Sequence, residues 1–429
     1  MKPLLLSTVL LLAATAPADE LHTFKRIQLS DQFWSEGANA GDLNNDGVKD
    51  IISGPYWWQG PDYKTRHEYY PATTTFQLKL GPMTAITVPG FEGFLGKENK
   101  YSDNFFVWTY DFNRDNWNDI LVIGFPGTDT SWFENPKGKA GHWTRHKIFA
   151  QTDNESPTFA DLTGDKQPEL ICITAGRYGY AQPDWNDPAK PWSFHAISPN
   201  KKYGNFTHGM GIGDLNGDGR ADLLEKDGWW EQPASLAGDP EWTFHAQPFG
   251  SGGAQMHAYD VNNDGLADVI TSLTAHSYGL GWYEQYREGA AIKFREHVFV
   301  NKEPGDSPYG VKVSEIHAID LVDMDGDGVK DIVTGKRFWS HGRTGDPDRN
   351  DAAVLYWFRL VRGPSGVDFV PYLIDDASGV GTQIVATDVN GDSLPDIVVG
   401  NKRGTFVHLH GKKTVTREEW EKAQPRRMR

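Results

Sequence analysis

The sequence is poor in cysteine: Cys172 is its only one, so the chain cannot form an intramolecular disulfide and must depend on packing and bound ions. Beyond its first residues it has no apolar run long enough to cross a bilayer. Basic residues are also in deficit, with 42 Lys and Arg against 58 Asp and Glu and a net charge of −16. Phosphate backbones bind basic surfaces, so the composition argues against a nucleic-acid partner.

The N-terminus holds the one concentrated apolar stretch. Lys2 is followed by apolar residues from Leu4 to Ala14, and small residues continue to Ala18. A basic start, a short apolar core and small residues before a cleavage point predict a signal peptide over residues 1–18. The mature protein is therefore expected to be exported, to the periplasm or the extracellular space.

A nine-residue pattern of carboxylates recurs seven times along the chain. Its form is Asp-x-(Asn/Asp/Thr)-x-Asp-x-x-x-(Asp/Glu), and successive copies are spaced by 46 to 69 residues. Units of this length suit one four-stranded propeller blade each. The copies begin at Asp42, Asp111, Asp161, Asp214, Asp260, Asp323 and Asp388.

The residues around each copy predict four strands per unit. A segment of alternating polarity precedes the loop and a β-branched run follows it, which is typical of a hairpin. An aromatic doublet such as Trp229-Trp230 marks a third strand, and an aromatic-x-x-His pattern such as Trp242 to His245 marks a fourth. Because these histidines recur with the repeat, we expect them to have a packing or hydrogen-bonding role.

The two ends of the chain predict how the ring is closed. The last unit lacks a fourth strand, whereas a spare strand precedes the first unit around Phe24 to Leu29. If that strand completes the last blade, no sheet edge stays open. The predicted fold is therefore all-β, a seven-bladed β-propeller over residues 19–410 that the N-terminal strand closes. A short basic tail at residues 411–429 is expected to lie outside it as a short helix or a disordered end.

The Asp loops bring carboxylate and amide oxygens together at positions 1, 3, 5 and 9, and calcium takes roughly six to eight oxygen ligands. These loops are shorter than an EF-hand and have strands on both sides. They resemble the FG-GAP (VCBS-type) repeats of integrin-alpha-like propellers, in which such loops bind calcium. That resemblance implies structural calcium ligands at Asp42, Asn44, Asp46, Asp50, Asp111, Asn113, Asp115, Asp119, Asp214, Asn216, Asp218, Asp222, Asp260, Asn262, Asp264, Asp268, Asp323, Asp325, Asp327, Asp331, Asp388, Asn390, Asp392 and Asp396.

An alternative is that some loops are Asx-turns whose side chains bond to their own backbone. This alternative best suits the loop that begins at Asp161, because Thr163 is a poor ligand and Lys166 brings a positive charge. Metal is expected above all in the loops that begin at Asp42, Asp214, Asp260 and Asp323.

The propeller face opposite the Asp loops is predicted to hold a polar cluster. First strands begin there and second strands end there, and many ionisable residues occupy those positions. His208, His257 and His317, with Glu155 and Glu315, are the residues expected to bind zinc or another divalent ion. The alternative is that they are hydrogen-bonded polar residues at strand ends.

Three runs are similar to the propeller part of aldos-2-ulose dehydratase: Gly54–Trp58, His276–Glu284 and Gly335–Trp339. The cupin part of that family is missing here. The family eliminates water from keto-sugars with a divalent metal present, and the resemblance implies lyase or dehydratase chemistry on a carbohydrate.

The residues at the same face suit such chemistry. The predicted catalytic residues are His276 and Tyr278 as bases, Lys336 and Arg337 as orienting cations, and His341. The basic residues can instead pair with neighbouring acids. The predicted substrate-binding residues are Arg177, Tyr178, Gln255, Gln383, Lys402 and Arg403.

Two classes of function remain open. The first is an enzyme that acts on a carbohydrate or another small polar ligand. The second is a non-catalytic propeller that binds glycans or a protein partner, as integrin-like propellers do. Calcium alone in the purified protein would favour the binding protein, and calcium with a stoichiometric transition metal would favour the enzyme.

Overall fold

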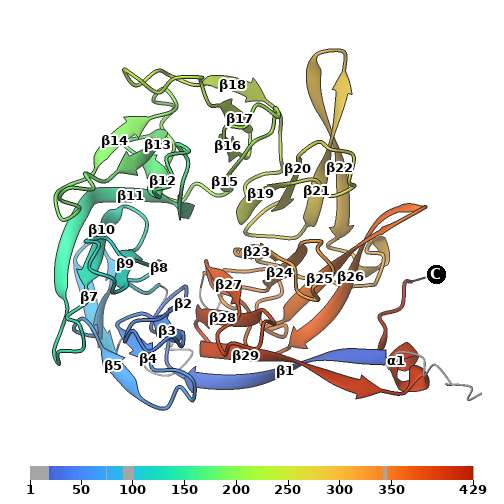
Figure 1. Cartoon of the computed structure of the whole chain (residues 1–429), viewed down its shortest axis with the longest axis horizontal. Helices are drawn as coiled ribbons and strands as arrows, with labels where there is room; N and C mark the ends of the chain where they lie inside the picture. Colours follow the sequence, from blue (N-terminus) through green and yellow to red (C-terminus); the bar gives the residue numbers. More distant parts are fainter. Residues whose placement is uncertain (1–18, 74, 90–100, 342–344, 429) are drawn as a thin grey trace, which may run out of the picture.

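The computed structural model describes residues 19–73, 75–89, 101–341 and 345–428. Its strands form small sheets arranged in a ring around one central axis (Figure 1). This arrangement confirms the predicted all-β propeller. The signal peptide predicted for residues 1–18 lies outside the described residues. Within the described ranges, no helix has the length and apolar character needed to cross a membrane.

Antiparallel pairing divides the strands of the described residues into seven four-stranded units. The long strand β11 serves two units, and β15 pairs in parallel with β19 of the next unit. The first three units are β2(Asn39–Gly41), β3(Asp50–Ser53), β4(Tyr56–Trp58), β5(Arg66–Glu68); β8(Phe106–Tyr110), β9(Asp119–Ile123), β10(Thr128–Glu134), β11(Thr144–Ala160); and β11 with β12(Glu169–Thr174), β13(Arg177–Gln182), β14(Ser193–Ala196).

The other four units follow the same order of strands. They are β15(Met210–Gly213), β16(Asp222–Glu225), β17(Gly228–Glu231), β18(Thr243–Ala246); β19(Gln255–Tyr259), β20(Asp268–Ser272), β21(Leu280–Glu288), β22(Ala291–Val300); β23(Ile319–Val322), β24(Asp331–Gly335), β25(Leu355–Gly363), β26(Gly366–Asp375); and β27(Ile384–Thr387), β28(Asp396–Asn401), β29(Gly404–Val415), β1(Asp19–Ser30). A short helix η1(Pro304–Asp306) follows β22, and a hairpin of β6(Thr75–Gly81) and β7(Thr84–Pro89) is inserted after the first unit.

The N-terminal strand closes the ring as predicted. β1 pairs antiparallel with β29 from Asp19 opposite Val415 to Ser30 opposite Thr405. In Figure 1 the blue β1 lies beside the red β29. The last sheet therefore has its fourth strand, and β29 is paired on both sides instead of forming the outer edge.

Apolar cores fill the spaces between neighbouring units. One buried cluster joins Ile52 and Trp57 of the first unit to Ile120 and Phe133 of the second. Another joins the last unit to the first through Val398 and other residues. Strands with β-branched residues on both faces suit this arrangement, because each sheet packs against a neighbour on either side.

The recurring histidines stack on third-strand aromatic rings. The ring of His245 lies 4.1 Å from that of Trp229, at 13°, and His297 lies 4.5 Å from Trp282 in the same way. His245 Nε2 is also 2.7 Å from Glu231 Oε2. The predicted packing and hydrogen-bonding role of these histidines is therefore confirmed.

The C-terminal residues are held against the sixth unit. β29 continues to Val415, and α1(Arg417–Ala423) follows, with a capping box at Thr416. The Tyr372 hydroxyl donates to Gln424 Oε1 at 2.8 Å, and Met428 N donates to Pro308 O at 2.8 Å. The predicted short helix is present, but the last sheet continues beyond residue 410 and the tail does not hang free.

Candidate metal centre

Two overlapping groups of side chains meet on the face opposite the Asp loops. His208 precedes β15, His276 follows β20 and His317 precedes β23. One ligand nitrogen from each lies within 4.8 Å of the other two. His276 forms a second group of the same spacing with Glu315 and His341. We call these five residues the histidine cluster, and they come from the fourth, fifth and sixth units.

Hydrogen bonds orient two of the cluster rings. His317 Nδ1 lies 3.1 Å from the carbonyl oxygen of Glu315, so we assign the proton to Nδ1 and the lone pair to Nε2. His317 Nε2 is buried and has no hydrogen-bond partner among the described residues. His341 Nδ1 lies 2.7 Å from Asp346 Oδ1, and no hydrogen bond to its Nε2 is found among the described residues. A ring held at one nitrogen with a lone pair at the other is typical of metal-binding histidines.

His276 connects the two groups. Its Nε2 lies 2.8 Å from His208 Nε2, and the two rings cross at 81°. Its Nδ1 lies 3.7 Å from Glu315 Oε2. Because His276 follows a second strand while His208 precedes a first strand, the contact depends on the meeting of those strand ends on one face.

Glu315 occupies a strained and buried position in the cluster. Its φ of 60° is in the left-handed region, which costs a non-glycine residue on the order of 1–3 kcal/mol. Backbone bonds hold it there: its N–H donates to Ser277 O, and Arg337 N–H donates to its carbonyl oxygen, both at 2.9 Å. Ser340 Oγ donates to Oε2, whereas buried Oε1 has no partner among the described residues.

Two of the cluster imidazoles, those of His208 and His317, are held in their neutral form. Burial lowers the pKa of His208 to about 3, and the charges of His276 and Arg337 lower it further. Burial, and then the Arg337 charge, hold the pKa of His317 well below its usual value. Neutral imidazole is the form that binds metals, and imidazole nitrogens with a carboxylate suit zinc and similar divalent ions. The residues present therefore fit such an ion.

Arg337 and Glu155 do not have their predicted roles. Both are buried near the axis, where Arg337 Nη2 lies 3.0 Å from Glu36 Oε2 and Nη1 lies 3.2 Å from Glu155 Oε2. This buried triad joins the first, third and sixth units. The guanidinium is occupied by two carboxylates, so Arg337 is not free to orient a substrate and Glu155 is not part of the metal group. The alternative, in which the basic residue pairs with acids, is correct here.

His257 and two glutamines are also used elsewhere. His257 Nε2 lies 3.2 Å from Ile319 O, and His257 belongs to neither group of the cluster. Gln255 Oε1 accepts from Ile319 N at 2.9 Å. The Gln383 amide accepts from Val107 N and donates to Val107 O. These side chains bond to the backbones of other units, so they are occupied by the protein rather than by a metal or a substrate.

The other predicted substrate-binding residues are buried or bond to the protein itself. Tyr178 is fully buried. Arg177 and Arg403 each donate to a backbone carbonyl, and buried Lys402 donates to the carbonyl of Ser340 at 3.2 Å. Of the four, Lys402 approaches the histidine cluster, because the hydroxyl of the same Ser340 donates to Glu315.

Tyr278 and Lys336 lie beside the cluster with partners of their own. The Tyr278 hydroxyl donates to Asp348 Oδ2 at 2.6 Å, and Lys312 Nζ is 2.6 Å from the same oxygen. Burial and then Asp348 raise the pKa of Tyr278, which keeps its hydroxyl protonated near neutral pH. Lys336 Nζ donates to Ser314 Oγ, and burial lowers its pKa. Both side chains are therefore bonded to neighbouring protein groups.

The sequence interpretation missed Ser340 and Asp346. Asp346 Oδ1 accepts from Ser340 Oγ at 3.0 Å and also holds His341. Both oxygens of Asp346 accept from His341 N. These residues lie after β24 in an insertion without strand periodicity, so no repeat position marks them. The only signal was their closeness in sequence to His341.

The ninth position of the Asp loops has a structural role. Asp268 is buried, and its carboxylate accepts from Val261 N at 2.8 Å and from Gln285 N at 2.7 Å. It therefore ties the loop to the third strand of its own unit. The same pair of bonds is made by Asp50, Asp119, Asp222, Asp331 and Asp396.

The remaining loop positions combine Asx-turn bonds with closely spaced carboxylates. Asp42 Oδ2 accepts from Gly47 N at 2.8 Å, and the other loops contain comparable bonds. Three carboxylates lie within 4.8 Å of one another in two loops, Asp161 with Asp165 and Glu169, and Asp323 with Asp325 and Asp331. The first of these is the loop for which the sequence favours the Asx-turn alternative.

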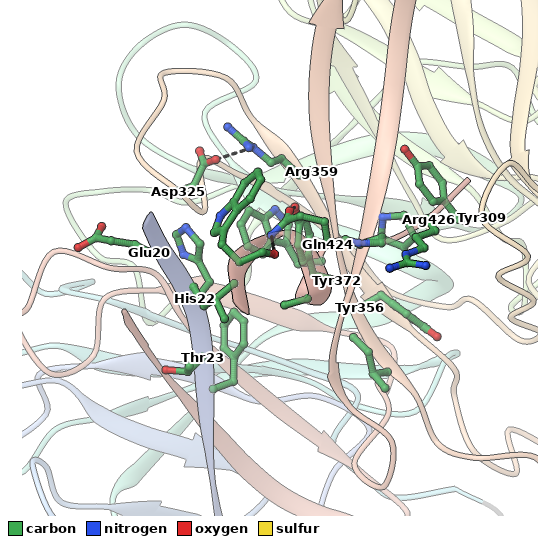
Figure 2. Close-up of a pocket in the computed structure, with 18 of the residues that line it drawn as sticks. Glu20, His22, Thr23, Tyr309, Asp325, Tyr356, Arg359, Tyr372, Gln424 and Arg426 are labelled. Carbon is green, nitrogen blue, oxygen red and sulfur yellow. Dashed lines mark hydrogen bonds and ion pairs between the residues drawn. The ribbon is translucent and has the colours of Figure 1, made fainter. Parts of the chain in front are cut away.

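An arginine competes for the loop that begins at Asp323. Arg359 Nε lies 2.6 Å from Asp325 Oδ2 and Nη2 lies 3.1 Å from Asp327 Oδ2. This ion pair borders a cavity of about 580 Å³ between β1, β25, β26 and α1 (Figure 2). No cluster residue lines that cavity, so it is separate from the candidate metal centre.

The ring of four-stranded antiparallel sheets defines the class of protein, a β-propeller. Family models match two parts of the chain, an FG-GAP-like repeat at residues 111–172 and an FG-GAP repeat at residues 380–414. The protein is thus a propeller of FG-GAP-type repeats, as its Asp loops predicted.

A comparison with curated proteins gives no match. Similar solved structures include an Agrocybe aegerita lectin that recognises terminal N-acetylglucosamine, at 13% identity and TM-score 0.33 over 91% of this chain and 86% of that one. The rhamnogalacturonan lyase YesW has 12% identity and TM-score 0.39 over 94% and 74%. BBS1N has 8% identity and TM-score 0.47 over 91% and 96%. Likeness at this level says nothing about ligand or activity.

Proposed function

We propose that the histidine cluster binds zinc or a similar divalent transition metal and that the protein acts there on a carbohydrate, by elimination of the lyase or dehydratase type. The observation that supports this most directly is His317 Nε2, a buried lone pair without a partner, beside His208 and His276. An unpaired nitrogen in this position costs free energy unless a ligand completes it.

The substrate class rests on a resemblance in sequence. The run from His276 to Glu284, which is similar to the propeller of aldos-2-ulose dehydratase, supplies the residue shared by both groups of the cluster. A bound metal would polarise the carbonyl of a keto-sugar and so acidify the neighbouring C–H bond.

The residues of the chain supply the proton transfer. His341 accepts a proton at Nε2, and Asp346, bonded to Nδ1, stabilises the resulting imidazolium. Glu315 Oε1 is a second acceptor in the same group. Elimination also requires a proton for the departing hydroxide, and the protonated His341 is placed to return it.

The Asp loops on the opposite face of the propeller stabilise the fold that carries this site. In this proposal calcium occupies Asp loops as a structural ion, and the protein works outside the cytoplasm after export. Seven divalent ions would offset most of the net charge of −16. A metal-filled scaffold without disulfides is consistent with a single, buried cysteine.

Elemental analysis of the wild type, His317→Ala and His142→Ala tests the proposal. His142 lies on the surface beside Glu68 and is the matched control. We expect one equivalent of transition metal in the wild type and the control, and about tenfold less in His317→Ala, which loses one ligand. His276→Gln is the second cluster variant. Its position is exposed, so a loss of metal there is not explained by misfolding, as it could be in the buried His317→Ala variant.

Activity gives the second readout. With keto-sugars as substrates, the enone product of water loss absorbs in the ultraviolet, and its formation should stop in His317→Ala. Calcium as the sole bound metal, or full metal content in both cluster variants, would contradict the proposal and favour the non-catalytic binding propeller.

A further inference from the structure

A second cavity lies between the first and second units, apart from the histidine cluster. Its volume is about 500 Å³. Aromatic rings of Tyr70, Phe125 and Trp143 form part of its wall, and Asp103 and Arg145 add charged groups. Cavities of this size that combine apolar walls with a few polar groups are typical small-ligand sites.

The charged groups of this cavity are held in place. Arg145 Nη2 lies 2.6 Å from Asp129 Oδ2, and both Asp129 and Arg145 bond to Ser131 Oγ, at 2.8 and 3.0 Å. Asp103 Oδ2 accepts from Thr73 Oγ1 at 2.7 Å and forms no ion pair within the described residues. The cavity therefore presents one paired and one uncompensated carboxylate.

Aromatic residues extend from this cavity to the chain segment that carries His208. Phe125, in the cavity wall, packs edge to face on Phe206 with ring centres 5.5 Å apart. Phe206 is 49% exposed and lies two residues before His208. Backbone bonds fix its neighbours, because Asn154 N donates to Asn205 O at 2.7 Å and Glu155 N donates to the carbonyl of residue 207 at 3.0 Å. The exposure of Phe206 is therefore a property of an anchored segment.

We propose that this cavity is a saccharide subsite and that the substrate of the histidine cluster is a neutral oligosaccharide chain, which runs over Phe125 and Phe206. The inference rests on the proposed function of the cluster. Aromatic faces stack on the apolar faces of sugar rings, and fixed carboxylates accept hydroxyl hydrogen bonds.

The charge of the cavity sets the class of saccharide. Asp129 pairs with two cations, Arg145 at 2.6 Å and Lys147 at 3.9 Å, whereas Asp103 pairs with none among the described residues. An acidic sugar would bring a further carboxylate beside Asp103, and like charges that are partly shielded from water repel. A purely apolar ligand would leave Asp103 desolvated without a partner. Neutral sugars avoid this charge repulsion, and their hydroxyl groups can donate hydrogen bonds to Asp103.

Calorimetry with neutral oligosaccharides tests the subsite. The probes are the disaccharide and hexasaccharide of cello-, manno- and xylo-oligosaccharides, with hexagalacturonate as the acidic comparison. We expect one neutral hexasaccharide to bind about tenfold more tightly than its disaccharide, the equivalent of about one charge-assisted hydrogen bond. Asp103→Asn and Phe206→Ala should each remove most of that gain. Leu373→Ala, at a 53% exposed position on β26, should keep it.

The outcomes separate this inference from the proposed function. The tighter binding of the hexasaccharide than of the disaccharide should persist in His317→Ala, even if that variant shows that no metal binds at the cluster. The inference is wrong if no neutral hexasaccharide binds, if hexagalacturonate binds more tightly, or if both subsite variants keep the full gain. Asp103→Asn changes one exposed side chain, so loss of binding there is not a folding defect.

Discussion

At the scale of single residues, the Asp268 carboxylate is the acceptor for two backbone N–H groups that no water reaches. Asp268→Ala leaves both donors buried and unpaired, at roughly 1–3 kcal/mol each. We therefore expect the free energy of unfolding to fall by about 2–5 kcal/mol in urea denaturation. The measurement is made in EDTA, so that metal binding does not contribute.

Asp62→Ala is the control for Asp268→Ala. Asp62 is an exposed carboxylate that pairs with Lys64 at the surface, and its removal should leave the denaturation midpoint unchanged. Equal midpoints for the two variants would show that the ninth loop position does not have the structural role described here.

The offset of a residue from its Asp loop predicted part of the cluster. His208 and His317 each lie six residues before a loop, and the structure brings them together, whereas His257 lies three residues before its loop and points elsewhere. Sequence position alone did not predict the role of Arg337. A strand end can face the open mouth or a neighbouring unit, and only the buried partners Glu36 and Glu155 decide between the two.

At the scale of elements, β1 is the only strand of the last unit supplied by the N-terminus. Without residues 19–30 the whole length of β29 would lose its outer partner, and Ile27 and Leu29 would leave the core between the last unit and the first. An unpaired strand edge is also prone to aggregation. We expect the chain without residues 19–30 to be aggregated or unfolded, as judged by size-exclusion chromatography and circular dichroism.

A synthetic peptide of residues 19–30 provides the complementary measurement. If β1 acts by completing the sheet, the peptide should restore a monomeric species and its thermal transition, whereas a scrambled peptide should not. A truncated chain with the wild-type melting temperature would contradict this role for the strand.

The sequence repeat predicted which strands are present better than it predicted where each strand begins and ends. Aromatic doublets and recurring histidines marked the third and fourth strands because their spacing follows the blade. Residues 144–160 form one strand shared by two units, which a unit-by-unit interpretation divides. Periodicity could not predict the position of the C-terminal tail, because that position depends on single contacts such as the one between Tyr372 and Gln424.

At the scale of the whole molecule, two sets of buried groups respond to pH in opposite directions. Burial raises the pKa of the ninth-position carboxylates, to about 6 for Asp50 and Asp396 and to about 7 for Asp119, Glu169, Asp222, Asp268 and Asp331. Burial lowers the pKa of other side chains, to about 4 for His22, His408 and His410 and to about 3 for His208.

Each set contributes stability over a different range of pH. A carboxyl whose pKa is higher in the folded state than its usual value near 4 binds its proton more tightly when folded. Its contribution is present at low pH and is lost as pH rises through about 6 to 7. A histidine with a lowered pKa stabilises the folded state above its usual value near 6.5, and this contribution is lost as pH falls below that value.

The melting temperature in EDTA should therefore rise as pH is lowered from 8 to about 6.5, because the carboxylates gain protons there while the buried histidines stay neutral. Below that range the histidines oppose the gain, so the rise should become shallower. Calcium favours ionised carboxylates, and if it occupies the Asp loops it should raise the melting temperature most at pH 8 and flatten this dependence. Differential scanning calorimetry with and without calcium measures both effects. A melting temperature that falls from pH 8 to 6.5 in EDTA would show that the buried carboxylates do not control the stability of the ring.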